Sequence, residues 1–147
     1  MGIIKWAEAI KQFEGWKPGS RSFKNHNPGN LRYSAYTASL GAIGKDSGRF
    51  CIFEDDRAGF AALCIFLDDA ANRRLRPYHV FSASNPYHWK LMPEGRNGDE
   101  LPDFTLEDFY QVYAPEGDGN APSGYARFVA DKLGTTPDCP IKEIFFL

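Results

Sequence analysis

Glu14 is the residue of this chain whose type and setting most directly suggest chemistry. Counted at about 3.6 residues per turn, it lies on the same side of the first predicted helix as Ile3, Ala7 and Ile10, among apolar side chains. At a helix C-terminus, burial and the negative end of the helix dipole both disfavour ionisation of a carboxyl group. A carboxyl group that stays protonated near neutral pH is able to act as the general acid of a glycosidase.

A structural role is the alternative for Glu14. Charged residues at the frayed end of a helix often fall on the inward side by count alone. The stem of Glu14 would then pack against the core while its carboxylate reaches water or pairs with Arg32 or Arg57.

Three asparagines follow Glu14 in the segment "NHNPGNLRY", which spans residues 25–33. Asn25, Asn27 and Asn30 surround a Pro-Gly pair, a composition typical of a tight turn. Side-chain amides beside an acid also suit the recognition of sugar hydroxyl and N-acetyl groups. Aromatic residues make up 15% of the chain, with 12 Phe, 7 Tyr and 3 Trp, and such a surplus suits a groove that stacks on sugar rings.

A second carboxylate would decide the reaction, because glycosidases with two acids hold them about 5–9.5 Å apart. The chain has no Asp or Glu between Glu14 and Asp46. After Asp46 the next candidates are Glu54, Asp55 and Asp56, and helix capping explains these three better. We therefore expect a reaction that uses Glu14 alone.

The element that must position Glu14 is a helix over 3–14, which Gly15 ends and Pro18-Gly19 keeps from resuming. The Gly, Ser and Asn content of residues 17–49 predicts an irregular loop followed by a small hairpin. The last strand of that hairpin is expected at 49–53.

A second helix is expected after the hairpin, capped by Asp55 or Asp56 and continuing to about residue 74. Small residues near its start, among them Ala58 and Gly59, favour the close approach of another helix. Residues 77–103 carry Pro, Asn and Gly and predict at most a short helix near 78–83.

The C-terminal part predicts two further helices. The first begins at the capping box formed by Thr105 and Asp108 and ends at Pro115. After a turn in "EGDGN", the second covers 122–133 and ends at Gly134. The closing "IKEIFFL" is apolar enough to dock against the rest of the chain.

These elements predict a mainly helical α+β fold, a single domain over 1–147 with a small β-hairpin after the first helix. The net charge is −2 and no Lys/Arg run is present, which argues against binding to a nucleic-acid backbone. No apolar window is long enough for a membrane span, and the N-terminus lacks the pattern of a secretory signal.

The cysteines and histidines predict neither a metal site nor a cofactor. Cys51, Cys64 and Cys139 are odd in number and lack CxxC spacing, so neither a zinc site nor a disulfide framework is expected. Cys51 and Cys64 lie in apolar runs and are interpreted as core residues, which argues against an amidase or peptidase that pairs one of them with His79 or His88. The histidines show no metal-ligand spacing: His26, His79 and His88.

A family resemblance adds to these observations. Four motifs follow one another along the chain: Glu14 at a helix end, "NPGNLR" at 27–32, "FEDDRAGFAAL" at 53–63 and a late "YAP…N…Y". This ordered set resembles the lysozyme-like, peptidoglycan-cleaving proteins of bacteriophages and prophages, whose layout is shared with soluble lytic transglycosylases and goose-type lysozymes. "NPGNL" is also similar to the "NNLFG" loop of flagellar and autolysin-type glucosaminidases. The resemblance covers roughly residues 3–133 and implies a lysozyme-like fold.

By this resemblance Glu14 is the general acid that protonates the glycosidic oxygen between N-acetylmuramic acid and N-acetylglucosamine. In lytic transglycosylases one Glu acts first as acid and then as base, while the muramoyl 6-hydroxyl attacks and forms a 1,6-anhydro product. The absence of a second acid before Asp46 favours this reaction over hydrolysis. The resemblance further implies a set of loop-shaping and substrate-binding residues: Asn27, Asn30, Tyr113, Asn120 and Tyr125.

Other functions stay open on the same residues. One is a hydrolytic muramidase or glucosaminidase, and another is a non-catalytic module that keeps the fold to bind glycan or a partner. The burial of an unpaired carboxyl argues against the module. The expected partners are peptidoglycan glycan strands. Without a signal sequence, we expect synthesis in the cytoplasm and delivery to the cell wall as a phage endolysin, a virion lysin or an injected effector, the last with an immunity protein.

Overall fold

The computed structural model describes residues 2–72, 74–75, 78, 104–115 and 120–147. Two predicted features therefore lie wholly or mostly outside the described residues, the short helix near 78–83 and the turn at 116–120. The chain divides into two compact units, which are described separately. The loop unit is Ala7–Leu67, and the helical unit comprises Met1–Trp6 and Asp68–Leu147.

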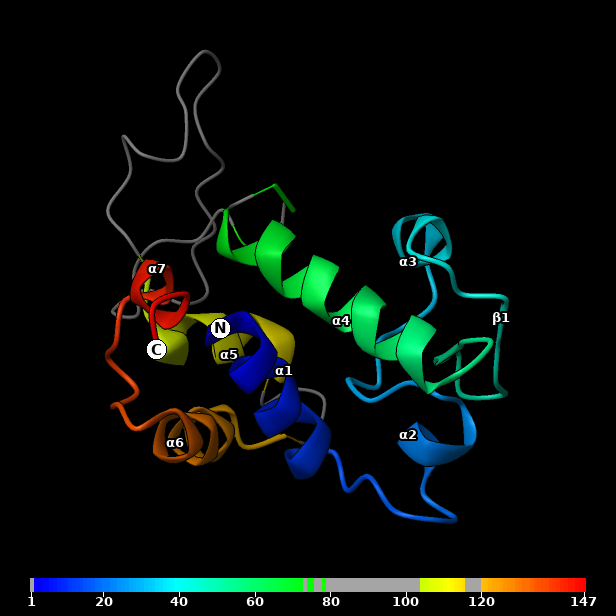
Figure 1. Ribbon diagram of the computed structural model, residues 1–147, viewed down its shortest axis with the longest axis horizontal. Coiled ribbons are helices and arrows are strands. Elements are labelled where there is room, and N and C mark those ends of the chain that lie inside the picture. The colour runs from blue at the N-terminus through cyan, green and yellow to red at the C-terminus, as the bar shows by residue number, and fades with distance from the viewer. Residues whose placement is uncertain (1, 73, 76–77, 79–103, 116–119) are drawn as a thin grey trace. The chain divides into compact units, whose positions relative to one another are not determined.

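Helix α1, Gly2–Phe13, begins in the helical unit and ends in the loop unit. The loop unit continues with two short helices, α2 at Arg21–Lys24 and α3 at Ala35–Ser39. A hairpin follows, in which β1, Gly44–Lys45, pairs antiparallel with β2, Cys51–Ile52. Figure 1 shows α2 and α3 along the irregular chain between α1 and the hairpin.

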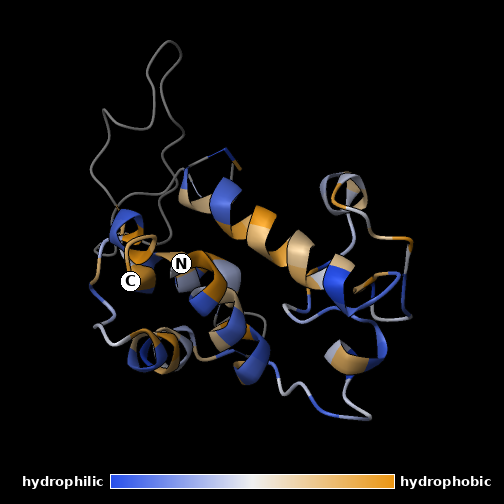
Figure 2. Ribbon diagram, viewed as in Figure 1, coloured by the Kyte–Doolittle hydropathy of each residue, from blue (hydrophilic) through white to orange (hydrophobic). Residues whose placement is uncertain are grey.

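Helix α4, Asp56–Ala71, runs from the loop unit into the helical unit. The Asp55 carboxylate accepts a 2.8 Å hydrogen bond from the backbone N–H of Ala58, so Asp55 caps the helix as predicted. In Figure 2 the ribbon of α4 is hydrophobic through its middle and hydrophilic at its start and again shortly before its last residues, and the buried side chains include Leu63 and Leu67.

The helical unit contains α5, Leu106–Tyr113, α6, Pro122–Leu133, and α7, Ile141–Ile144. The predicted capping box is present at α5 and Gly134 ends α6 in the left-handed conformation, at φ 72°. Helix α7 docks through Ile141 and Ile144, which are fully buried. The prediction that the closing segment packs is confirmed.

The fold class is confirmed: the described residues form a mainly helical α+β chain with a small two-stranded hairpin after the first helix. The irregular loop predicted over 17–49 was wrong in part, because it contains α2 and α3. Both helices have only four or five residues, and the caps Ser20 and Ser34 hold them rather than an apolar periodicity. The single-domain assignment stays a prediction. Among the described residues no helix is long and apolar enough to cross a membrane.

Candidate functional site

Glu14 is the C-cap residue of α1, one position after the last helical residue. Gly15 follows with a φ of 76°, a conformation that glycine adopts without steric cost. The backbone N–H groups of Gly15 and Trp16 then donate to the carbonyls of Gln12 (3.1 Å) and Lys11 (3.3 Å), the pattern of a Schellman motif. Glycine therefore fixes both the end of the helix and the direction in which Glu14 leaves it.

The apolar side of α1 does not extend unchanged to Glu14. Ala7 and Ile10 are fully buried as predicted, whereas Phe13 is 42% exposed and Glu14 is half-buried. The expectation of a carboxyl at the centre of a buried stripe was therefore too strong. The final turn of the helix emerges from the core, and Glu14 lies at the boundary between core and solvent.

The side chain of Asn30 contacts Glu14 directly. Its Nδ2 donates a 2.9 Å hydrogen bond to Glu14 Oε1. Asn30 has a φ of 47°, in the left-handed region that Asn tolerates better than most residues, and its N–H donates to the Asn27 carbonyl at 3.0 Å to close the turn. Asn30 Oδ1 is buried and has no hydrogen-bond partner among the described residues. The structure thus brings together two motifs, the helix-end acid and the "NPGN" turn.

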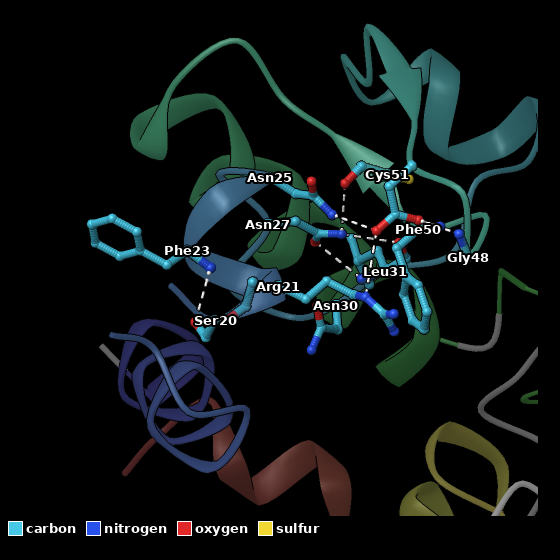
Figure 3. A network of polar contacts seen from close by, with 12 residues as sticks. Ser20, Arg21, Phe23, Asn25, Asn27, Asn30, Leu31, Gly48, Phe50 and Cys51 are labelled. Atoms are coloured by element: carbon cyan, nitrogen blue, oxygen red, sulfur yellow. Dashed lines mark hydrogen bonds and ion pairs between the residues drawn. The ribbon is translucent and has the colours of Figure 1, made fainter. Parts of the chain in front are cut away.

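Asn27 holds the same turn in place from inside (Figure 3). Its side chain is fully buried, and Nδ2 donates to the carbonyls of Leu31 and Cys51, each at 3.0 Å. Its Oδ1 accepts from the Leu31 N–H at 3.0 Å. The loop-shaping role expected of Asn27 agrees with these contacts. The side chain is inaccessible to a sugar, so we do not carry Asn27 forward as a direct sugar contact.

Asp46, the first alternative for a second acid, is engaged in the hairpin. Its Oδ1 accepts hydrogen bonds from the N–H groups of Phe50 and Gly48, both at 2.9 Å. Its Oδ2 accepts from Asn25 Nδ2 at 3.0 Å and lies 3.4 Å from Arg21 Nε. The hydrogen bond from the Phe50 N–H, with those from Asn25 and Gly48 and the charge of Arg21, lowers the pKa of Asp46. These contacts give this carboxylate a structural role.

The other three candidates for a second acid lie at the start of α4. Asp55 caps the helix, in agreement with the prediction, and Glu54 is exposed. Asp56 instead pairs with His26, whose Nδ1 lies 2.6 Å from Asp56 Oδ1. At least three of the four candidates are thus used in capping, turn formation or a hydrogen bond with a histidine.

Gly59 of α4 allows the "NPGN" turn to approach the helix closely. A Cβ at this position would overlap the carbonyl oxygen of His26 and touch Pro28. The small residues at the start of α4 were expected to admit another helix, but at Gly59 it is the loop that packs there. His26 itself has a φ of 52°, so the turn is held in an uncommon conformation.

The remaining predicted residues belong to the helical unit, where Tyr113 is partly exposed and Tyr125 is buried. The Tyr113 ring stacks on Phe109 with centroids 5.3 Å apart and meets Tyr125 edge-on at 5.9 Å. Asn120 is exposed and its Nδ2 donates to the Pro115 carbonyl at 3.4 Å. Sugar binding by these three residues stays a prediction.

The cysteines offer little nucleophilic character. Burial raises the pKa of the Cys51 thiol and of the Cys64 thiol, which lowers the thiolate fraction at neutral pH. His79 and His88, their proposed partners, lie outside the described residues. Within the described ranges, no group of three or more His, Cys, Asp or Glu side chains is placed to hold a metal ion.

The sequence analysis did not single out an aromatic pair in the segment that follows Glu14. The Trp16 and Phe23 rings lie 5.3 Å apart, both half-buried, and Lys11 Nζ lies 4.8 Å from the centre of the Trp16 ring. Partly exposed aromatic rings close in sequence to a carboxyl suit stacking with a sugar ring. The available signal was the pair of aromatic residues in a Gly- and Pro-rich segment, where a core role is uncommon.

Comparison with known proteins adds no relative. A scan against protein-family models, a search of curated proteins and a search of solved structures each found no match. The family resemblance therefore stays a hypothesis that depends on the residues described above.

Proposed function

We propose that this protein cleaves the glycan strands of peptidoglycan at the bond between N-acetylmuramic acid and N-acetylglucosamine, with Glu14 as general acid. The observation that carries the proposal is the 2.9 Å hydrogen bond from Asn30 Nδ2 to Glu14 Oε1. It joins two of the four motifs that carry the lysozyme-like resemblance, Glu14 and the "NPGN" turn. The Trp16–Phe23 pair adds an apolar surface of the kind that sugar rings contact.

A reaction with one glutamic acid fits the described carboxylates best. Glu14 donates its proton to the glycosidic oxygen as the bond to the muramoyl C1 breaks. The muramoyl 6-hydroxyl then forms the new bond to C1, and its proton passes to the Glu14 carboxylate. The products are a 1,6-anhydromuramoyl end and a free N-acetylglucosamine 4-hydroxyl, and Glu14 is again protonated.

Asn30 suits both protonation states of Glu14. In the orientation observed, Nδ2 donates to the carboxylate, as the base step requires. Rotation of the amide by 180° would present Oδ1, which has no partner among the described residues, to the proton of the acid form. Asn30 is thus able to keep Glu14 in one position while its proton leaves and returns.

Substitution of Glu14 tests the proposal. Glu14→Gln removes the proton donor and keeps the size of the side chain, so we expect clearing of purified peptidoglycan to slow by a factor of about 10²–10⁴. Glu8→Gln is the matched control, because Glu8 is an exposed glutamate of the same helix. Thermal unfolding of both variants shows whether the fold is intact. Lysis by a folded Glu14→Gln variant at the rate of the control would contradict the assignment.

A non-catalytic glycan-binding module is the second candidate, and one observation favours it. A module that only binds glycan has no need of a buried, unpaired carboxyl group. Glu14 is only half-buried and accepts a hydrogen bond from Asn30, so its setting is also compatible with binding alone. The module predicts that the unaltered protein binds peptidoglycan and releases no soluble fragments.

A further inference from the structure

The net charge of the chain conceals a strong local asymmetry. Although the chain carries −2 overall, residues 11–50 contain seven Lys and Arg against two acids, Glu14 and Asp46, a net of +5. This segment includes the end of α1, the "NPGN" turn and the first strand of the hairpin with the turn that follows it. The part of the chain that holds the candidate acid is therefore basic.

Four exposed cations of this segment gather around the hairpin, and together they define the hairpin cation patch: Arg21, Arg32, Lys45 and Arg49. The guanidinium carbons of Arg21 and Arg32 lie 4.5 and 4.7 Å from the centre of the Phe50 ring. Lys45 Nζ lies 5.3 Å from the centre of the Tyr33 ring, and the Tyr33 N–H donates to the Arg49 carbonyl at 2.9 Å. Aromatic rings thus support the long side chains of three cations.

Most of the positive charge of the patch is not neutralised. Asp46 lies at its centre but pairs with Arg21, and its oxygens also accept hydrogen bonds from the hairpin backbone and Asn25. Among the described residues, Arg32, Lys45 and Arg49 have no carboxylate within ion-pair distance. Three cations are therefore free to bind an external anion.

The patch shares its framework with the partner of Glu14. Arg32 is two residues after Asn30, and the intervening Leu31 accepts a 2.8 Å hydrogen bond from the Cys51 N–H. Phe50, which contacts both arginines, immediately precedes Cys51 and forms an isolated bridge with Arg32. The patch and Asn30, the partner of Glu14, therefore belong to the same loop and hairpin, so a glycan strand bound at Glu14 would be bound to the structure that also carries the patch.

We propose that the hairpin cation patch binds the carboxylates of the short peptides that peptidoglycan strands carry, which makes peptide-bearing glycan the preferred substrate. This inference rests on the proposed cleavage of peptidoglycan. A guanidinium group presents several N–H donors in a plane that matches a carboxylate. Separate cations around a hairpin suit several carboxylates spaced along a flexible peptide, and the overall charge of −2 disfavours a long nucleic acid.

Binding of an inactive protein to insoluble peptidoglycan tests this inference independently of cleavage. The parent is Glu14→Gln, and the patch variant adds Arg32→Gln, Lys45→Gln and Arg49→Gln. Two substrates are compared, peptidoglycan with its peptides and the same material after an amidase has removed them. The matched control adds Arg57→Gln to the parent, because Arg57 is exposed in the first turn of α4, outside the patch.

We expect the patch variant to bind peptide-bearing material about tenfold more weakly than the parent, since it lacks three exposed cations and each exposed charge pair contributes about twofold. On peptide-free material the two should bind alike, and the Arg57→Gln protein should match the parent on both. An increase in salt from about 0.1 to 1 M, which shortens the screening length from ~10 to ~3 Å, should remove the advantage of the parent. The single Lys45→Gln change, which leaves the hairpin contacts of Arg32 and Arg49 intact, should weaken binding by about twofold.

Equal binding of the patch variant and the parent to peptide-bearing material would overturn the inference. An equal loss on peptide-free material would do the same, as would stronger competition by duplex DNA than by the released peptides. If the patch variant loses peptide-dependent binding but the protein with Glu14 intact yields no cleavage products, only the proposed cleavage fails.

Discussion

The two units of this protein are each stabilised internally by a different kind of interaction. In the loop unit, polar side chains bind the backbone: the buried amide of Asn27 bonds Leu31 and the distant Cys51, and the partly exposed carboxylate of Asp46 bonds Gly48 and Phe50 within its own hairpin. In the helical unit, aromatic rings pack against one another: Tyr110 stacks on Tyr125 at 4.3 Å and accepts a 3.1 Å hydrogen bond from Trp6 Nε1. The candidate site is therefore held by hydrogen bonds, which require a particular geometry, whereas the helical unit is held by a packed apolar core.

Backbone conformation separates the units in the same way. The non-glycine residues with positive φ among those described are His26, Asn30 and Arg49, all in the loop unit. Such conformations carry a cost, and surrounding contacts must hold them. His26 directly precedes the "NPGN" turn, and Asn30 is the last residue of the turn and contacts the candidate acid. This concentration is typical of functional loops.

The largest effect on stability is expected from removal of the Asn27 amide. Asn27→Ala deletes three buried hydrogen bonds, those to the Leu31 N–H and to the carbonyls of Leu31 and Cys51. The Leu31 carbonyl keeps the Cys51 N–H, but the other two groups lose their Asn27 partner, so the free energy of unfolding should fall by about 3 kcal/mol. Hydrogen exchange should locate the loss in residues 25–53. Asn120→Ala, at an exposed Asn, is the control and should change stability by less than about 0.5 kcal/mol. A loss of similar size in both variants would remove the distinction between the units.

A smaller loss is expected from Gly59→Ala. The added methyl group would overlap the His26 carbonyl, and overpacking of this kind lowers the free energy of unfolding by about 1–3 kcal/mol. Because the "NPGN" turn must move away from α4, peptidoglycan clearing should fall as well. Ala61→Gly, at an exposed position of the same helix, is the control, because it measures how an exchange between Gly and Ala changes helix stability without a packing contact. Unchanged stability would show that the turn does not pack against α4 as described.

In the helical unit, Tyr110→Phe should lower the free energy of unfolding by about 1–2 kcal/mol, because the buried Trp6 Nε1–H loses this acceptor while the stacking on Tyr125 remains. Chemical denaturation measures this change. A loss as large as that of Asn27→Ala would mean that polar contacts stabilise the helical unit as strongly as they do the loop unit.

Acid should weaken the loop unit through Asp46. Since the pKa of Asp46 is lower in the folded than in the unfolded chain, this residue adds stability above its unfolded pKa. That contribution is lost as the pH falls through the lower, folded value. Asp46→Asn should therefore be less stable than the parent at neutral pH, and the difference should shrink towards about pH 2. Glu54→Gln, at an exposed acid, should show no such convergence, and a constant difference for Asp46→Asn would contradict the mechanism.

Local patterns in the sequence predicted α1, α4, α5 and α6, because periodic apolar residues and side-chain caps act within a few residues of each other. They missed α2 and α3, which have no apolar period of their own. The Asn27–Cys51 bond joins residues 24 apart, which no local pattern reveals. The basic patch was missed for another reason: net charge averages a basic loop unit with an acidic remainder.

Mass spectrometry of the fragments released from purified peptidoglycan tests the central claim most directly. We expect the unaltered protein and Glu8→Gln to release muropeptides with a 1,6-anhydromuramoyl end, which are lighter by one water than hydrolysis products. Glu14→Gln should release none. Fragments with reducing muramic acid ends would show that the reaction is hydrolysis rather than transglycosylation, and Glu14 would still be the acid. New amines or peptide carboxyls, or the same fragments from Glu14→Gln, would contradict the claim that Glu14 cleaves the glycan strand.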